Sequence, residues 1–294
     1  MKVIFIVKPI GENKLKQLSK TIEAAFDPEI DSFSIFETRK KGHAISLTQK
    51  AIDEKADVVV ACGGDGTINE VARGLVETNV ALGIIPLGSG NGIARHFKIP
   101  FGFTPSIELI KKYPPSKIDV GVVNGNYFLG NMGCALESHF IKQYQKNEWH
   151  GIWAYGVACL GALLSFKHQN ILLNLNQTPQ KISPFVFLIS NTNQQGYDFT
   201  LTPNAVANDG KLDLFWMDKS SVMKRLKFLL YAVLRRKLSA PEINRALISE
   251  LKIEMFDAED FCVQVDGEHI PISEKTLEVK VLPKQLNAIV PPIA

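Results

Sequence analysis

The sequence predicts two domains, a layered α/β domain followed by a domain of mainly antiparallel strands. Three observations predict this. The chain has 294 residues, and domains commonly hold ~100–200. In the first third, short apolar runs alternate with helical stretches, as in a parallel sheet covered by helices. Beyond Pro114-Pro115, Asx-Gly pairs at Asn124-Gly125, Asp209-Gly210 and Asp266-Gly267 stand between β-rich flanks, and such pairs tolerate the positive φ of hairpin turns.

The apolar runs of the first domain have the length of short buried strands. We expect strands at Val3–Val7, Ser34–Phe36, Val58–Cys62 and Ala81–Ile85, and helices at Glu12–Phe26 and His43–Lys55.

The second half predicts an antiparallel sheet or sandwich interrupted by helical stretches at Trp149–Phe166 and Ser221–Leu238. The predicted domains are 1–115 and 116–294. The tail Pro283–Ala294 is apolar and contains proline, so we expect it to pack back onto a domain, with the first domain as the candidate.

Composition restricts the class of protein. The chain is 46% hydrophobic and 21% charged, with a net charge of +3 from 33 basic and 30 acidic residues. Such near-balance argues against nucleic acid as a partner. The four cysteines form no CxxC pair, which favours a reducing compartment. The uncharged stretch Gly151–Phe166 is shorter than the ~20 residues of a membrane-spanning helix. We expect a cytoplasmic protein, with contact at the inner face of the membrane left open.

One glycine-rich segment joins a buried strand to a helix, Cys62–Val71. Its glycines permit a sharp turn and close approach of a ligand, and the helix N-terminus favours a phosphate. Thr67 and Glu70 have the spacing of a helix capping box. Asp65 would repel a phosphate by itself, so its position indicates that it holds Mg²⁺ through water or accepts a proton. The alternative is a plain strand-to-helix turn.

A second loop, Pro86–Asn91, also lies between a strand and a helix. Loops that follow neighbouring strands line one crevice of an open α/β sheet. A purely structural role for this loop is an equal alternative. Neither segment is a GxxxxGK[ST] phosphate loop, and the dinucleotide GxGxxG is absent from its proper position.

Several motifs together resemble the superfamily of diacylglycerol kinases, sphingosine kinases and bacterial YegS-like lipid kinases. They occur in family order over nearly the whole chain. They are GGDGTINE at Gly63–Glu70, PLGSGNGIARHF at Pro86–Phe97, Thr38, the segment Gly133–Ser138, and the acidic motifs Asn208–Asp213 and Val265–Glu268.

The resemblance implies an α/β nucleotide domain with a layered sheet like those of NAD kinases and phosphofructokinases, and a C-terminal β-sandwich. It implies ATP, Mg²⁺ and transfer of the γ-phosphoryl group to a lipid hydroxyl, with the active site between the domains. Phosphoryl transfer depends mainly on positioning and charge neutralisation. The implied nucleotide site comprises Lys8, Thr38, Gly63, Gly64, Asp65, Gly66, Thr67, Ile68, Asn69, Ser89, Gly90 and Asn91.

The resemblance also assigns roles to acidic residues. Asp266 would be the catalytic base, with Glu268 as a helper or metal ligand, while Asp65 would organise Mg²⁺ or serve as base. Glu137 would meet the lipid head group. A structural Mg²⁺ would be held by Asp209, with the backbone carbonyls of Val206 and Lys211.

Two segments depart from the family pattern. Lys8 stands where an NPxSG-like segment has asparagine, and would touch a phosphate as a cation. The GFDA segment reads Ala135-Leu-Glu-Ser138. These departures keep open a nucleotide-binding regulator without catalysis. A kinase for a soluble substrate, of the NAD-kinase type, is another alternative. Plain hairpin turns would explain Asp209 and Asp266, and a solvated charge would explain Glu137.

The stretch from Ser221 combines apolar and basic residues. Val222, Leu226, Leu229, Leu230, Val233 and Leu234 fall on one helical face, flanked by lysines and arginines. Such a helix can lie on an anionic bilayer, so transient membrane contact is expected for a lipid substrate. A core-packed helix with a solvated basic face is the alternative. The sequence leaves the oligomeric state and the acceptor lipid open.

Overall fold

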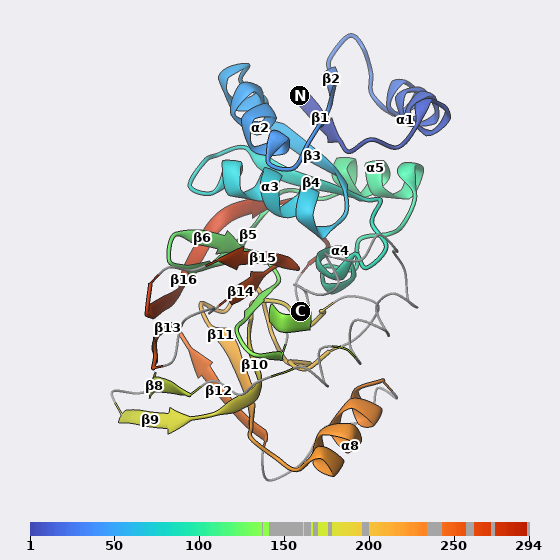
Figure 1. Cartoon of the computed structure of the whole chain (residues 1–294). Helices are drawn as coiled ribbons and strands as arrows, with labels where there is room; N and C mark the ends of the chain where they lie inside the picture. The colour runs from blue at the N-terminus through green and yellow to red at the C-terminus, as the bar shows by residue number, and fades with distance from the viewer. Residues whose placement is uncertain are drawn as a thin grey trace. The chain divides into compact units, whose positions relative to one another are not determined.

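The computed structural model describes residues 1–136, 138–140, 161, 166, 170–175, 178–195, 200–233, 243–256, 262–271 and 274–292. The chain divides into two compact units (Figure 1). Unit 1 contains Met1–Val120 and Pro283–Ala294, and unit 2 contains Gly121–Leu282. Within the described ranges, no helix is both long and apolar enough to cross a membrane.

Unit 1 contains a parallel sheet with the strand order β2-β1-β3-β4. The end of β16 joins β4, where Ala288 pairs with Leu82. Its elements are β1 (Lys2–Val7), α1 (Glu12–Ala25), β2 (Ser32–Glu37), α2 (His43–Asp53), β3 (Val58–Gly63), α3 (Asp65–Leu75), β4 (Ala81–Pro86), α4 (Gly92–His96) and α5 (Phe103–Lys112).

Helices cover both faces of this sheet, which explains the uninterrupted apolar strands. All six residues of β3 are buried. On one face, Val3, Phe5 and Val7 of β1 pack with Leu18 of α1 and Ile107 of α5. On the other face, α2 and α3 pack together and α3 contacts β3. Strands buried on both faces read as continuous apolar runs, as the sequence predicts here.

Unit 2 is a sandwich of two sheets. One has the order β16-β13-β8-β9, and the other β12-β11-β10-β7-β14-β15. The elements are β6 (Asn126–Phe128), β7 (Asn131–Gly133), β8 (Ile171–Leu175), β9 (Thr178–Ile182), β10 (Pro184–Ser190), β11 (Leu212–Asp218), α8 (Val222–Val233), β12 (Ile243–Ile248), β13 (Glu250–Met255), β14 (Cys262–Val265) and β15 (Glu268–Pro271). Strands β5 (Ser116–Val123) and β16 (Thr276–Ala288) contribute residues to both units.

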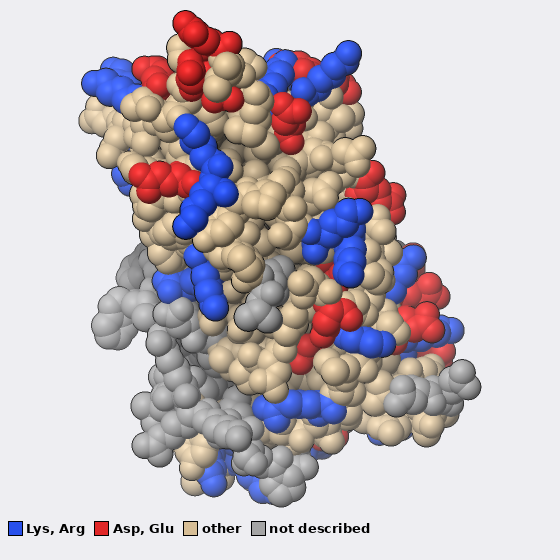
Figure 2. Space-filling model, turned by 180° about the vertical axis from the view of Figure 1, so that it is seen from behind, with Lys and Arg blue, Asp and Glu red and all other residues tan. Residues whose placement is uncertain are grey.

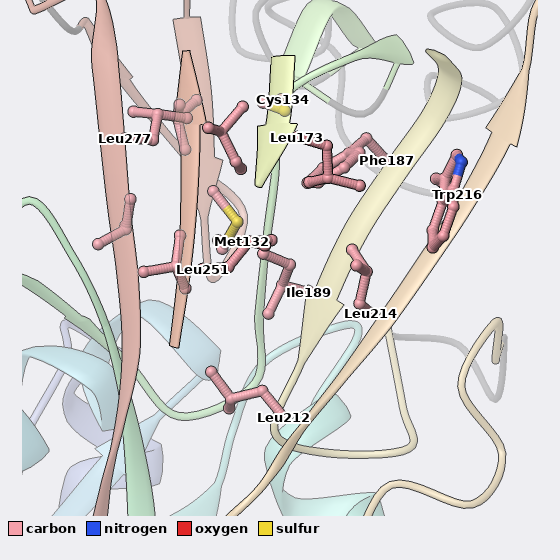
Figure 3. Close-up of a cluster of buried hydrophobic side chains, with 14 of the residues drawn as sticks. Met132, Cys134, Leu173, Phe187, Ile189, Leu212, Leu214, Trp216, Leu251 and Leu277 are labelled. Atoms are coloured by element: carbon pink, nitrogen blue, oxygen red, sulfur yellow. The ribbon is translucent and has the colours of Figure 1, made fainter. Parts of the chain in front are cut away.

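The sandwich core lies between the two sheets. Figure 3 shows Leu251 and Leu277 of the first sheet in one cluster with Phe187 and Leu214 of the second. The second sheet is also covered on its outer face, where Phe215 packs in another cluster with Phe228 of α8 and others. Strand β11 therefore sends alternate side chains into two cores, which is why five of its seven residues are apolar.

The structure confirms the α/β class of the first domain and the sandwich class of the second. Two Asx-Gly pairs form tight hairpin turns. Asn124 and Gly125 join β5 to β6 with φ of 44° and 78°, and Asp266 and Gly267 join β14 to β15 with φ of 47° and 79°. Consecutive positive φ values are the signature of the type I′ turn.

The hairpin predicted at Asp209-Gly210 is wrong. Gly210 does have a φ of 72°, but it lies in the long connection that leads from β10 into β11. The predicted helix at Trp149–Phe166 lies outside the described residues except for Gly161 and Phe166. Helix α8 covers the described part of the second predicted helix, whose last residues, from 234, also lie outside.

The division between the units falls inside β5, after Val120, five residues beyond Pro115. Residues Pro283–Ala294 belong to unit 1. There Ile289, which is 2% exposed, packs in the core of the parallel sheet. Asp119 is fully buried and accepts a hydrogen bond from the amide of Lys284 at 2.8 Å. This bond satisfies the backbone where Lys284 takes a positive φ of 56°.

Candidate functional site

Four candidate ligand-binding segments follow the carboxyl ends of parallel strands in unit 1. Lys8 follows β1, Thr38 follows β2, the first glycine loop begins at the end of β3, and the second follows β4. Because the strands are parallel and adjacent, these segments lie along one edge of the sheet. Open α/β sheets bind their ligands at this edge.

The two glycine loops approach each other through their backbones. A Cβ added at Gly64 would lie 3.1 Å from Cα of Gly88, and one added at Gly88 would lie 2.6 Å from Cα of Gly64. The amide of Leu87 donates to the carbonyl of Gly63 at 2.7 Å. Neither Gly64 nor Gly88 has a positive φ. Glycine is needed here because the two loops leave no room for a side chain, rather than for the sharp turn that the sequence suggested.

The side chain of Asp65 connects the first loop to the second. Its Oδ2 accepts from the amide of Gly92 and its Oδ1 from the amide of Ile93, both at 3.0 Å. Burial raises the pKa of Asp65, and the hydrogen bonds from Ile93, Gly92 and its own amide, together with nearby Arg95, oppose that rise. The carboxylate thus sits at the N-terminus of α4, where a helix favours negative charge.

Asn91 shapes the second loop from within. Its Oδ1 accepts from the amide of Gly88 and its Nδ2 donates to the carbonyl of Gly88, both at 2.8 Å. Asn91 has a φ of 49°, a left-handed conformation that asparagine tolerates better than most residues. Ser89, at the tip between them, is exposed. The loop therefore presents Ser89 and Gly90 on a tightly held backbone.

The predicted capping box of Thr67 and Glu70 is wrong. Helix α3 begins at Asp65, with Gly64 as its N-cap and no side-chain cap, so Thr67 lies inside the first turn. Glu70 instead accepts hydrogen bonds from the amides of Gly42 at 2.7 Å and Ala44 at 3.1 Å. It thereby holds the start of α2, at the end of the segment that carries Thr38.

The predicted nucleotide residues differ in accessibility. Gly64, Asp65, Gly66, Thr67 and Gly90 are partly exposed, whereas Thr38 is 9% and Asn69 7% exposed. Ile68 is fully buried in the interior of unit 1, so its side chain belongs to the core. Lys8 is partly exposed at the end of β1. Burial and the neighbouring charge of Lys14 lower the pKa of Lys8.

In unit 2, three backbone amides surround the carboxylate of Asp266. The amide of Leu129 donates to Oδ2, and those of Gly130 and Asn131 donate to Oδ1, each at 2.8 Å. The main chain of Asp266 is also fixed, because its amide donates to the carbonyl of Asn131 at 2.9 Å. This carboxylate has a defined position in the β14–β15 turn, unlike a solvated turn residue.

Two further acidic residues, Glu268 and Glu137, were also predicted to belong to the site of unit 2. Glu268 is partly exposed and begins β15, where it pairs in register with Val265. Glu137 lies outside the described residues, so its predicted contact with a lipid head group stays a prediction.

The predicted metal segment lies just before β11. Asp209 is exposed, and its Oδ1 accepts from the amide of Lys211 at 2.9 Å, while Val206 is partly exposed. Burial raises the pKa of Asp213 to about 6, and the charge of Asp209 adds to the rise. Among the described residues, no three His, Cys, Asp or Glu side chains group as metal ligands would. A cation at Asp209 would thus depend on backbone carbonyls, as Mg²⁺ and Ca²⁺ sites can.

Sequence reasoning missed the backbone groups that position the acids. The Leu129–Asn131 segment carried no recognised motif, yet it receives Asp266. Gly130 leaves room for this carboxylate, because a Cβ there would lie 2.8 Å from Oδ1 of Asp266. In the sequence, the pair Gly130-Asn131 was the one feature that could have pointed to this segment. The partner of Glu70 could not be found from local spacing, since it lies more than 25 residues away.

Comparison with known proteins supplies the family. Residues 2–123 match the model of the diacylglycerol kinase catalytic domain, and residues 136–290 match that of the YegS C-terminal NAD kinase beta sandwich-like domain. A Staphylococcus saprophyticus protein named diacylglycerol kinase is 25% identical over 240 residues, covering 80% of this chain and 78% of the relative. A Staphylococcus epidermidis protein of the same name is 26% identical, with 80% and 75% covered.

Solved structures share the fold. A crystal structure described as a diacylglycerol kinase from Bacillus anthracis superimposes with a TM-score of 0.73 at 23% identity, covering 99% of this chain and 97% of that one. A second structure from the same organism gives a TM-score of 0.78 at 24% identity, with 99% and 98% covered. The two domain models together span nearly the whole chain in the order of its two units. The chain therefore belongs to the diacylglycerol kinase family, with a diacylglycerol kinase catalytic domain followed by a YegS-type C-terminal domain.

Proposed function

We propose that this protein is an ATP-dependent lipid kinase that transfers the γ-phosphoryl group to a lipid hydroxyl, with diacylglycerol as the first acceptor to test. The observation that carries the proposal is the pair of glycine loops that Asp65 joins at the carboxyl ends of β3 and β4. The membership of the family supports the same chemistry. Diacylglycerol is chosen because the relatives are named diacylglycerol kinase. That this chain uses the same acceptor lipid is part of the proposal.

In this proposal the loops of unit 1 bind the nucleotide. The N-terminus of α3 and the Ser89–Gly90 tip offer backbone amides to the phosphates, and Lys8 adds positive charge. Amides at helix N-termini stabilise anions without further groups. Both oxygens of Asp65 already accept amides at the start of α4, directly after the second loop, so we assign Asp65 first to holding the end of that loop, with any contact to Mg²⁺ through water.

Asp266 is proposed as the base that receives the hydroxyl proton. Three backbone amides donate to its two oxygens, and they fix the carboxylate in position. A positioned base within hydrogen-bond reach is what proton transfer requires. Glu268 is proposed as its helper.

Mg²⁺ fits the proposal in two places. It would accompany the phosphates of ATP, where it would neutralise charge that develops during transfer. A structural ion would be held by Asp209 with carbonyls of Val206 and Lys211. Asp209 is exposed, and its carboxylate with backbone carbonyls is the kind of oxygen ligand that suits a hard cation.

The test is phosphate transfer from γ-labelled ATP to diacylglycerol, a sphingoid base, phosphatidylglycerol and an isoprenoid alcohol, each dispersed in detergent micelles. We expect transfer to at least one lipid. We expect Asp266→Asn to reduce turnover by at least ~100-fold, within the range that a positioned acid or base supplies. We expect Asp65→Asn to reduce turnover as well, because the hydrogen bonds to Gly92 and Ile93 would be weakened. As a matched control, Asp53→Asn changes an exposed aspartate of α2 and should retain the wild-type rate.

Other outcomes would favour the alternative functions. Phosphorylation of NAD⁺ with no lipid phosphorylated would indicate a kinase for a soluble substrate. Tight ATP binding without transfer to any lipid or to NAD⁺ would indicate a nucleotide-binding regulator. Full activity of both aspartate variants would reject the catalytic assignment even if the lipid kinase activity is present.

A further inference from the structure

We propose that the exposed face of helix α8 in unit 2 is a docking surface for an anionic lipid bilayer. We call it the α8 patch, and define it as Met223, Lys224, Leu226, Lys227 and Leu230. The choice of a bilayer as partner rests on the proposed lipid kinase function. The geometry of the patch stands independently of that function.

The apolar residues of the patch form one stripe that faces solvent. Met223 is 75% exposed, Leu226 49% and Leu230 55%. At ~100° per residue, the three lie within about 60° of one another around the helix axis. Large apolar side chains scattered singly on a surface are ordinary, whereas a contiguous group marks an interaction site.

The opposite side of α8 is anchored in the interior of unit 2. Phe228 is 7% exposed, and its ring centroid lies 6.4 Å from that of Phe185 and 6.3 Å from that of Phe215. The guanidinium of Arg225 lies over the ring of Phe185 at 5.0 Å. Its Nε donates to the carbonyl of Ser220 at 2.9 Å. The helix therefore has a buried face, and its exposed leucines form a second, separate apolar face.

Charge identifies the partner. Lys224 and Lys227 are exposed beside the apolar stripe. The sequence from Lys219 to Lys237 contains seven basic residues and no acidic one. Elsewhere, on the face shown in Figure 2, basic and acidic side chains lie interspersed. An amphipathic helix with lysines beside its apolar face is suited to lie in the interface of an anionic bilayer. A second copy of this helix would instead place lysines against lysines.

A neighbouring strand extends the same face of the sheet. In β12, Ile243 packs against the cluster that contains Phe228, and side chains two and four residues on point to the same side. These are Arg245, whose guanidinium lies 5.1 Å from the ring centroid of Phe215, and Leu247, which is 61% exposed. The side of the sheet that carries α8 therefore presents a further basic and a further apolar residue.

The experiment is flotation of the full-length protein with vesicles of phosphatidylcholine alone or with one quarter phosphatidylglycerol. We expect wild type to bind the anionic vesicles at least tenfold more tightly than the neutral ones. Met223→Ser/Leu226→Ser/Leu230→Ser should weaken binding at least tenfold. Lys224→Gln/Lys227→Gln should weaken it about fivefold per lysine, the value that ~1 kcal/mol per charge gives.

Two control variants match these changes elsewhere on the surface. Ile30→Ser removes an isoleucine that is 73% exposed in unit 1, and Lys275→Gln/Lys280→Gln removes two exposed lysines of unit 2. Both controls should bind as wild type does. Thermal unfolding of each variant would verify that the surface changes leave the fold intact.

The outcomes separate this proposal from the kinase proposal. Wild-type-like vesicle binding by the α8 variants would overturn docking through the patch. So would light scattering in which the apolar variant alone changes from dimer to monomer, because the occupant would then be a second copy. Transfer to detergent-dispersed lipid should be unchanged in the α8 variants. Absence of this transfer in wild type would reject the lipid kinase function, whatever the vesicles show.

Discussion

At the scale of single residues, the position of Asp65 is the main departure from what its motif suggests. A carboxylate beside phosphates would repel them, yet burial within unit 1 already raises its pKa. Hydrogen bonds from the amides of Gly92 and Ile93 oppose this rise in pKa and place the carboxylate at the start of α4. The sequence identified Asp65 as a candidate functional residue. Its partners were not predictable, because they lie 27 and 28 residues away.

Lys8 leads to a prediction about pH. Burial and Lys14 lower its pKa, so its ammonium group loses its proton at a lower pH than an exposed lysine. If Lys8 contacts a phosphate, ATP affinity should fall as the pH rises through this lowered pKa. Lys8→Arg should retain affinity there, because arginine stays charged.

Calorimetric measurement of the ATP dissociation constant at a series of increasing alkaline pH values would check this. Lys16→Arg, at an exposed lysine of α1, is the matched control and should follow wild type. Equal pH dependence of wild type and Lys8→Arg would show that Lys8 does not contact the nucleotide.

At the scale of elements, apolar runs and turn residues predicted the strands and hairpins better than they predicted the contacts of the candidate site. The strands of unit 1 follow from their continuous burial, as in β3. The hairpins at Asn124 and Asp266 follow from local φ preferences. Local patterns could not show that Glu70 would hold the start of α2 instead of capping α3. Nor could they show which residues of α8 face solvent, because that depends on where Phe228 finds its partners.

The contact between the glycine loops gives an element-scale prediction. In Gly88→Ala the new Cβ would meet Cα of Gly64 and Oδ1 of Asn91, each at 2.6 Å. The Cα of Gly64 is a backbone atom, so it cannot move away from the new Cβ as the end of a flexible side chain would. We expect a loss of about 1–3 kcal/mol in the free energy of unfolding, as for other overpacked sites, and weaker ATP binding.

Urea denaturation would measure the effect on stability. Ser89→Ala, at the exposed neighbouring position, should stay within ~0.5 kcal/mol of wild type. If Gly88→Ala is as stable as wild type and binds ATP equally, the two loops do not need their close approach.

At the scale of the whole molecule, the chain leaves unit 1 after Val120 and returns to it at Pro283. An apolar tail that packs back was foreseeable from composition. Its pairing with β4 was not, since that depends on which strand edge is open. The returning segment is integral to unit 1, because Leu286, Ala288, Ile289 and Val290 are each at most 2% exposed.

Ile289→Ala should therefore destabilise unit 1. Removing most of a buried isoleucine side chain costs about 2–5 kcal/mol. Hydrogen exchange of the β1 and β3 amides would measure this loss within unit 1 itself. Ile30→Ala, at an isoleucine that is 73% exposed, should change protection by less than ~0.5 kcal/mol. Unchanged protection in Ile289→Ala would mean that the tail contributes little to unit 1.

The return of β16 also sets an order of events on the ribosome. The segment Gly121–Leu282 must be synthesised before Pro283–Ala294 can reach β4. At ~5–20 residues per second, this takes about 8–32 seconds. During that interval the β4 edge lacks its native neighbour, and an open strand edge is a site of mispairing with other chains. Chaperone contact with the nascent chain would have its longest opportunity at this edge.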